Sequence, residues 1–165
     1  MSILTAICDS IAGELNSHEW TTAVWQKPAA GMPPAFSLPV FTAERIYNPE
    51  RKLEETETLR VDVIAGDIQQ VAASRGTQQG DYRVDVAFRQ KIDISDNANV
   101  DALGSFVEEV ERYFFDQKQI QYTINDEIYG AGWMKSQIVY PYLPTQLRQD
   151  SQFVSLLRLT YRVIG

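Results

Sequence analysis

The stretch from residue 59 to residue 94 constrains the fold more than any other part of the chain. Apolar and polar side chains alternate from Leu59 to Val63 and again from Tyr82 to Phe88. Alternation with a period of two is typical of a strand that buries one face. Segment 74–81 between them carries no large apolar side chain. The pattern therefore predicts a long antiparallel hairpin that closes at a polar tip.

The same alternation predicts how the two strands pair. Apolar positions are odd in the first strand and even in the second, so partners whose numbers sum to an odd value bring both apolar sets to one face. Pairing Val71 with Val84, and Val63 with Ile92, satisfies this condition. Residues 65–67 (Ala-Gly-Asp) interrupt the first strand, and we expect a β-bulge there.

Two segments show the three- and four-residue spacing of amphipathic helices. The first spans residues 2–19, and Ser2 can cap its start. The second follows a turn at Asp96 and extends to about Phe115. The apolar stripes consist of Ile3, Leu4, Ile7, Ile11 and Leu15 in the first, and of Val100, Leu103, Val107, Val110 and Phe114 in the second.

The rest of the chain predicts shorter strands and irregular connections. Three prolines and a glycine exclude regular structure from residues 28–34. Further segments are a strand-like stretch at 36–47 kinked at Pro39, strands at 120–128 and 136–142 around a turn at 129–133, a polar connector at 145–152 and a final strand at 153–164. We expect one domain, residues 1–165, with an irregular proline-rich segment at 27–35 and a hairpin extension at 66–82.

The fold class expected from these elements is α+β. It is a two-layer sandwich of a mainly antiparallel sheet with a long β-hairpin and two helices packed on one face. The other face then carries charged residues: Arg60, Asp62, Arg83, Asp85, Arg89, Arg158 and Arg162. Such a face is either a solvated surface with weak ion pairs or a subunit interface in which charge pairing fixes the register between copies.

Composition excludes several classes of function. The 165 residues include 22 acids against 15 bases, a formal charge of −7, which argues against a sequence-independent binder of duplex DNA. A single cysteine, Cys8, allows no internal disulfide, and a single histidine, His18, removes most zinc and triad chemistry. We expect no enzyme activity, no metal and no cofactor. Without a long apolar run or a signal peptide, we also expect a soluble protein, intracellular where it is made.

The remaining candidates for chemistry have simpler structural explanations. His18 is either a general base or a solvated residue at a helix end, and we favour the latter because no nucleophile motif lies near it. Cys8 is either a reactive thiol or, as free cysteines usually are, a small buried hydrophobe. Asp126 and Glu127 point to opposite faces if they lie on a strand, so they are expected to be turn or surface acids.

The order of elements resembles the tail-terminator (tail-completion, neck) proteins of long-tailed bacteriophages. The similarity rests on the N-terminal helix, the hairpin 59–94, the helix 100–115 and the closing segment 147–163, in which a polar lead enters an alternating strand. It covers most of the chain. The proline-rich segment 28–34 and the charged connector 48–58 depart from the family pattern.

This resemblance implies a structural protein of the virion, at the neck or tail top, assembled in the host cytoplasm. Such proteins form a homo-oligomeric ring, a hexamer, that ends the tail tube and offers a docking surface to the head-side connector. They have no enzyme activity, and they bind no membrane. Genome DNA then passes through without sequence-specific binding, and an acidic lumen would repel its phosphates. A ring also closes open sheet edges through head-to-tail contacts.

We expect the contacts with partners and with other copies to lie at the hairpin tip, the proline-rich segment and the charged sheet face. Both irregular segments lack a core of their own, so ordering on assembly is expected. The predicted contact residues are Arg75, Thr77, Gln78, Gln79, Asp81, Met32, Arg60, Asp62, Arg83, Asp85, Arg158 and Arg162. Two other functions stay open at this point: a head-tail connector or stopper protein, and a monomeric α+β domain that binds a small ligand.

Overall fold

A computed structural model describes residues 1–26, 31, 35–47, 56, 58–93 and 96–165 of the chain. The helices in this part are α1 (Ile3–Ser17), α2 (Asn97–Gln117) and α3 (Pro144–Asp150). The strands are β1 (Val24–Gln26), β2 (Ala35–Ser37), β3 (Ala43–Ile46), β4 (Arg60–Ser74), β5 (Thr77–Lys91), β6 (Gln119–Ile124), β7 (Glu127–Tyr140) and β8 (Gln152–Ile164). Residues 27–30 and 32–34 of the predicted proline-rich segment lie outside the described residues.

Both predicted amphipathic helices are confirmed. The Ser2 side chain caps α1 by accepting a hydrogen bond from the backbone N–H of Thr5 (3.1 Å), and Asp96 caps α2 in the same way from Ala98 (2.9 Å). The stripes expected from the sequence face the core: α1 buries Ile7, Ile11 and Leu15, and α2 buries Leu103, Phe106, Val107, Val110 and Phe114.

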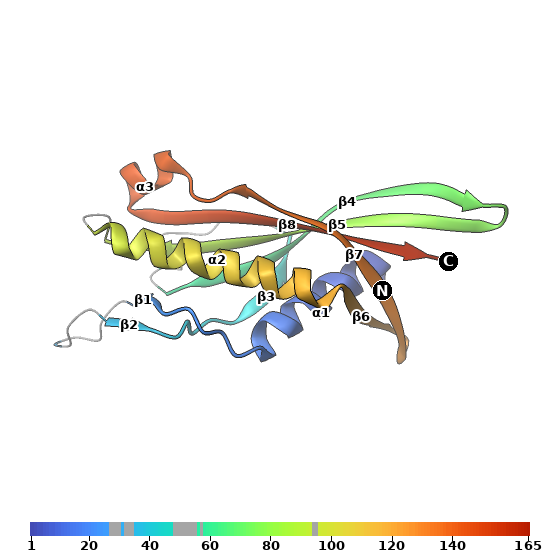
Figure 1. Cartoon of the computed structure of the whole chain (residues 1–165), viewed down its shortest axis with the longest axis horizontal. Helices are drawn as coiled ribbons and strands as arrows, with labels where there is room; N and C mark the ends of the chain where they lie inside the picture. The colour runs from blue at the N-terminus through green and yellow to red at the C-terminus, as the bar shows by residue number, and fades with distance from the viewer. Residues whose placement is uncertain (27–30, 32–34, 48–55, 57, 94–95) are drawn as a thin grey trace.

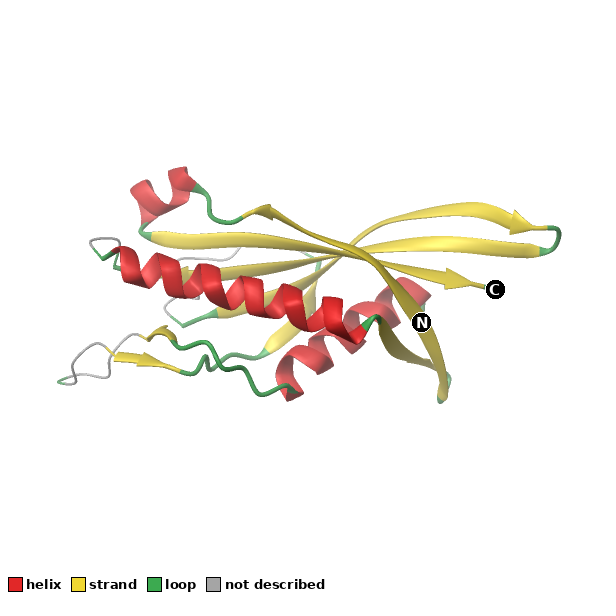
Figure 2. Cartoon of the chain, in the orientation of Figure 1, coloured by secondary structure: helices red, strands yellow, loops and turns green. Residues whose placement is uncertain are grey.

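The main sheet has six strands in the order β3-β4-β5-β8-β7-β6, and its pairs are antiparallel except β3 with β4. Helix α1 contacts both edge strands, β3 and β6, so the sheet curls around it (Figure 1). Helix α2 lies beside α1 on the same side of the sheet and packs against β7 and β8 (Figure 2). The α+β class with two helices on one face is therefore confirmed.

Helix α3 was not predicted, because its sequence reads as a polar connector. Pro144 occupies the first helical turn, where its missing N–H costs no hydrogen bond. Leu147 packs against the core, and the helix contacts β8 on the side away from α2 (Figure 1). Contacts with the rest of the fold therefore accompany a helix whose local pattern shows no apolar stripe.

The β4–β5 hairpin is confirmed, but its register differs from the prediction. Val63 pairs with Val86 instead of Ile92, and Val71 pairs with Gln79 instead of Val84. The reason is the turn, which consists of residues 75–76 alone, so that β5 begins at Thr77 and the expected loop 74–81 is mostly strand. The predicted odd sum still holds at the base of the hairpin, where both apolar faces point into the core.

The expected bulge lies between Ala65 and Ile68. A Cβ built on Gly66 would come within 2.6 Å of the Arg83 carbonyl oxygen, so only glycine fits here without a shift of backbone. The extra residue reverses which side chains face the core. Val71, predicted on the buried face, therefore lies on the opposite face and is exposed.

The turn between β6 and β7 also differs from the prediction. It lies at Asn125 and Asp126, which both adopt left-handed backbone (φ 51° and 67°), and not at residues 129–133. Two consecutive left-handed residues are what a tight hairpin with the right-handed strand twist requires, and Asn and Asp tolerate that conformation. Gly130 and Gly132 are consequently part of a continuous β7.

Phe106 of α2 lies at the centre of the buried cluster. Its ring contacts the rings of Trp20, Phe41 and Phe88, with centroids 5.6, 5.8 and 5.8 Å away. Strand β8 contributes Leu157, Leu159 and Tyr161 to the same cluster, as its alternation predicted. The core thus lies between the concave side of the sheet and the two long helices.

Candidate interaction surface

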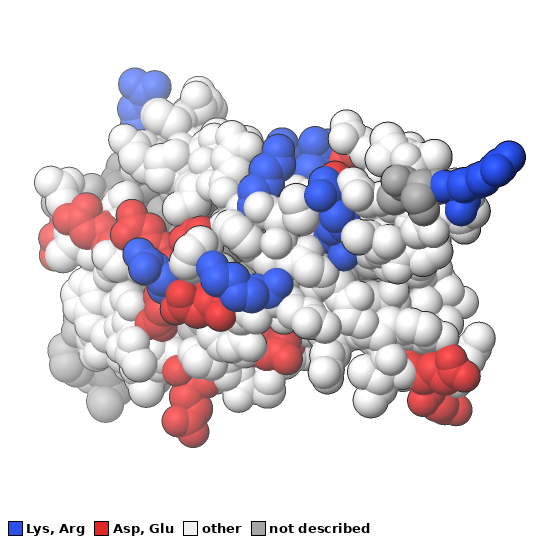
Figure 3. All heavy atoms as spheres, turned by 45° about the vertical axis from the view of Figure 1, so that its right-hand side comes forward, with Lys and Arg blue, Asp and Glu red and all other residues white. Residues whose placement is uncertain are grey.

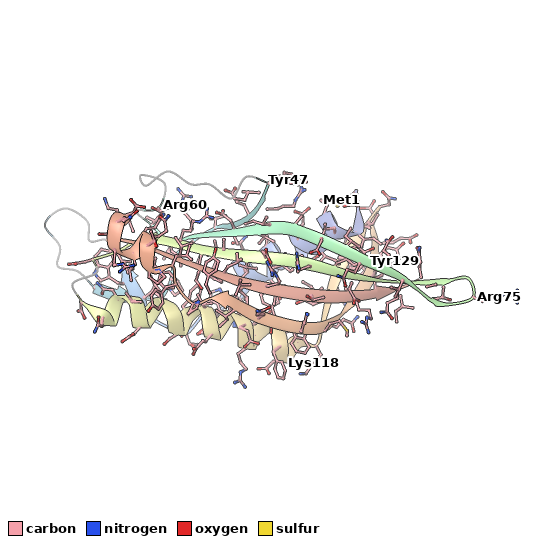
Figure 4. The ribbon with its side chains drawn as sticks, turned by 90° about the horizontal axis from the view of Figure 1, so that it is seen from above. Met1, Tyr47, Arg60, Arg75, Lys118 and Tyr129 are labelled. Carbon is pink, nitrogen blue, oxygen red and sulfur yellow. The ribbon has the colours of Figure 1, made fainter. Side chains whose placement is uncertain are left out.

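The β4–β5 hairpin projects beyond the helices and forms one end of the molecule (Figures 1 and 2). We call its outer part, residues 68–81, the arm. Arg75 is exposed at its tip, and Gly76 takes the left-handed conformation (φ +82°) that the tight turn needs (Figure 4). The C-terminus continues β8 along the arm, where Gln78 and Gly165 exchange backbone hydrogen bonds of 2.8 and 2.9 Å. Strand pairing, and not a core, therefore holds the arm.

The arm and the adjoining end of β8 present apolar side chains to solvent. Val71 is 57% exposed and Ile164 is 63% exposed, and both lie opposite Gln79 in the strand register. Strand β3 pairs with β4 only at residues 61–64, so no described strand covers the outer edge of the arm. Exposed apolar side chains beside an open strand edge are typical of a surface that another chain covers.

The predicted charged face forms a strip of ion pairs across β5 and β8. The guanidinium of Arg158 donates to both carboxylate oxygens of Asp85 (2.9 and 3.3 Å), and that of Arg162 to both of Asp81 (2.8 and 3.0 Å). Each pair is directly opposite in the register. The hydrogen bond from Arg162 holds the pKa of Asp81 below its usual value, and the bond to Asp85 raises the pKa of Arg158. These bidentate pairs join the two strands.

The other predicted contact residues are spread over the molecule. Arg83 pairs with Asp67 beside the bulge. Asp62 is only 1% exposed, with Arg89 4.0 Å away, and the structure therefore buries it instead of presenting it to a partner. Arg60 is half-buried at the opposite end of the sheet from Arg75 (Figure 4). Met32 lies outside the described residues.

Thr77, Gln78 and Gln79 belong to strand β5 and not to a flexible loop. Gln78 is exposed, whereas Thr77 and Gln79 are half-buried. The structure thus brings six predicted contact residues together on or beside the arm, Arg75, Thr77, Gln78, Gln79, Asp81 and Arg162.

Sequence reasoning missed a second projecting surface, the tip of the β6–β7 hairpin. Ile128 is 68% exposed and Tyr129 is 43% exposed. Asp126 and Glu127 are exposed beside them, and the Tyr129 hydroxyl donates to Glu127 Oε2 (2.6 Å). In Figure 3, acidic side chains gather at the lower right, where Figure 1 places this hairpin. The Asn-Asp pair at the turn was the signal that could have located it.

The two candidates for chemistry, Cys8 and His18, both pack against other side chains. Cys8 is fully buried, as expected of a small buried hydrophobe, and burial raises the pKa of its thiol to about 12. His18 is not a free solvated residue, because its ring packs between Trp20 and Tyr113 at centroid distances of 4.4 and 4.1 Å. A hollow of about 640 Å³ near this cluster is lined by His18, Glu19, Trp20, Thr21, Leu38 and Pro39.

Within the part of the chain that the structure describes, no group of three or more His, Cys, Asp or Glu side chains is placed to hold a metal ion. The described helices are also too short or too polar to cross a membrane. Comparison with models of known protein families and with curated proteins finds no match to this chain. The arm, the ion-pair strip and the β6–β7 hairpin are therefore the features from which a function is argued.

Proposed function

We propose that the chain is a structural virion protein that forms a ring, ends the tail tube of a long-tailed bacteriophage and joins it to the head-side connector. The observation that carries the proposal is the arm, which exposes Val71 and a strand edge that no described strand covers. A monomer gains nothing from such a surface and risks aggregation through it, whereas a neighbouring subunit or the tail tube would cover it.

A ring of copies suits the shape of the molecule. The arm lies at one end of the molecule, and the two edges of the sheet belong to different elements, so a contact between one edge of one copy and the other edge of the next would join unlike surfaces. Unlike surfaces build head-to-tail assemblies, which close into rings when the rotation per copy allows it. The resemblance in element order supplies the expected hexamer.

The charges agree with a passage for DNA. The chain carries a formal charge of −7, and Arg158 and Arg162 each spend their guanidinium on an aspartate of the neighbouring strand. Arginines paired in this way have few donors left for phosphate, so the strip offers no row of phosphate contacts. An acidic protein of this kind lets a nucleic acid pass without retaining it.

The test mixes the purified protein with a purified phage tail-tube protein and examines the tubes by electron microscopy. We expect tubes of limited length with a ring at one end. Val71→Asp places a charge on the arm and should reduce capping strongly, whereas Val40→Asp makes the same change on an exposed loop residue and should not. Long uncapped tubes with the unmodified protein would refute the proposal, and attachment to purified capsids alone would indicate a stopper protein.

A further inference from the structure

We infer that the arm of one copy binds the β6–β7 hairpin of the next copy, with Arg75 placed against the carboxylates of Asp126 and Glu127. This inference rests on the proposed ring and names the contact that builds it. The occupant of both surfaces is thus a second copy of this chain.

The contact has to form between copies because of the directions of the two hairpins. The arm continues the long strands straight out of the sheet, whereas the β6–β7 hairpin bends away on the other side of β8 (Figure 1). The arm tip and the acidic hairpin therefore stand apart at the same end of one molecule (Figure 3). A pairing of these unlike surfaces leaves a free arm and a free hairpin at the two ends of any open chain of copies, and ring closure satisfies both.

The two surfaces are similar in their apolar content. Val71 and Ile164 are exposed on and beside the arm, and Ile128 and Tyr129 are exposed on the hairpin. Burial of these side chains against one another contributes affinity but does not fix the relative orientation of the two copies. Tyrosine in particular adds large contact area at an interface.

The charges give the contact its direction. Arg75 forms no ion pair with any described residue, and neither does Asp126. Among the described residues, Glu127 accepts a hydrogen bond from the Tyr129 hydroxyl and forms no ion pair, so no described cation neutralises its charge. One cation on the arm thus faces two anions on the hairpin, and complementary charge of this kind selects orientation and speeds association.

The outer face of α2 is a weaker candidate for the same arm. It carries exposed acids such as Asp101 and Glu108, but none of the exposed large hydrophobic side chains of the described residues lies on this helix. Unlike α2, the β6–β7 hairpin combines exposed acids with exposed apolar side chains next to them. Glu108, together with Arg112 on the same helix, therefore provides matched control positions.

The first experiment reverses the charges and then exchanges them. Arg75→Glu should weaken self-association by about tenfold in sedimentation velocity, because the new carboxylate at residue 75 would then face the carboxylates of Asp126 and Glu127. Asp126→Asn with Glu127→Lys should do the same, and asparagine keeps the left-handed backbone of residue 126 acceptable. Combining all three changes should restore association. Arg112→Glu and Glu108→Lys, which change charge on α2, should leave it unaltered.

The second experiment links the two surfaces covalently. A variant with both Arg75→Cys and Glu127→Cys, treated with a short bismaleimide, should give a ladder of cross-linked oligomers on a denaturing gel. Each single variant should give no species larger than a dimer, because each copy then has one reactive site. The native thiol of Cys8 is fully buried and does not compete.

The outcomes separate this contact from the function of the ring. A ladder, together with restored association in the exchanged variant, supports the contact. If those oligomers then fail to cap tubes, the contact stands and the proposed tail-terminator function is wrong. If Arg75→Glu forms oligomers or tube-capping rings normally, and the double-cysteine variant forms oligomers but gives no ladder, the contact is wrong while the ring stands. A protein that stays monomeric alone and with tube protein overturns both.

Discussion

Glu109 joins the segment before β1 to helix α2, and its replacement has a calculable cost. Its carboxylate accepts hydrogen bonds from the backbone N–H and hydroxyl groups of Thr21 (3.0 and 2.8 Å) and Thr22 (2.9 and 3.0 Å). Burial by itself raises the pKa of Glu109, but these hydrogen bonds outweigh it and hold the pKa below its ordinary value. The ionised form is therefore the one that the fold stabilises.

Replacing Glu109 with alanine should lower the free energy of unfolding by about 2 kcal/mol, because hydrogen bonds to a charged group contribute roughly 1.5–3 kcal/mol and water replaces part of that at the exposed Thr21. For a chain of this length that loss corresponds to a melting temperature lower by roughly 4–8 °C. Glu109→Gln keeps one acceptor oxygen and should lose about half as much. Urea denaturation followed by circular dichroism measures both.

The effect should depend on pH with a definite sign. Because the folded-state pKa is lowered, the stabilisation is fully present above the unfolded-state pKa of about 4.5 and is lost as the pH falls through the folded-state value. The difference in stability between the unmodified protein and Glu109→Gln should therefore be largest near neutral pH and shrink below about pH 4.5. Glu108→Gln, on the exposed side of the helix, is the control. A difference that stays constant from neutral to acidic pH, or one equal to that of the control, would refute the reasoning.

Three further predictions concern the core, the bulge and the thiol. Phe106→Ala should cost about 3–5 kcal/mol of unfolding free energy, since it removes a fully buried ring among other rings, and a loss below about 1 kcal/mol would contradict this packing. Gly66→Ala should cost about 1–3 kcal/mol because its Cβ meets the Arg83 carbonyl, and an unchanged urea midpoint would show that the bulge is not tight. Cys8 should not react with a thiol reagent at about pH 8 until urea unfolds the protein, since burial raises its pKa to about 12, and fast labelling of the native protein would count against this burial.

The charged face illustrates how far a sequence pattern leads. Alternation placed Asp85, Arg158 and Arg162 on the face away from the helices, and the structure pairs each of them across a strand boundary. It could not distinguish these half-buried pairs from Asp62, which occupies the same face and is fully buried. Burial of a single residue depends on what covers it, and that information comes from distant parts of the chain.

Sequence reasoning predicted one of the two surfaces of the candidate site, the arm, and missed the other, the β6–β7 hairpin. A polar tip between two alternating strands located the arm, because both signals are local. The β6–β7 hairpin was missed because Gly130 and Gly132 suggest a turn at their own positions, whereas the actual turn is formed by Asn125 and Asp126. The ring, its hexameric number and its place in a virion rest on resemblance and stay predictions.

The sequence by itself determined the elements whose evidence lies within a few neighbouring residues. Helices α1 and α2, the strand character of β4, β5 and β8, and the α+β class all follow from the spacing of apolar side chains, because burial on one face imposes a period on the chain. Tertiary structure decided the strand register, the ordering of α3 and the exposure of Val71. Each of these depends on contacts between residues far apart in the chain, such as Gly66 against Arg83, whose energies no local period encodes.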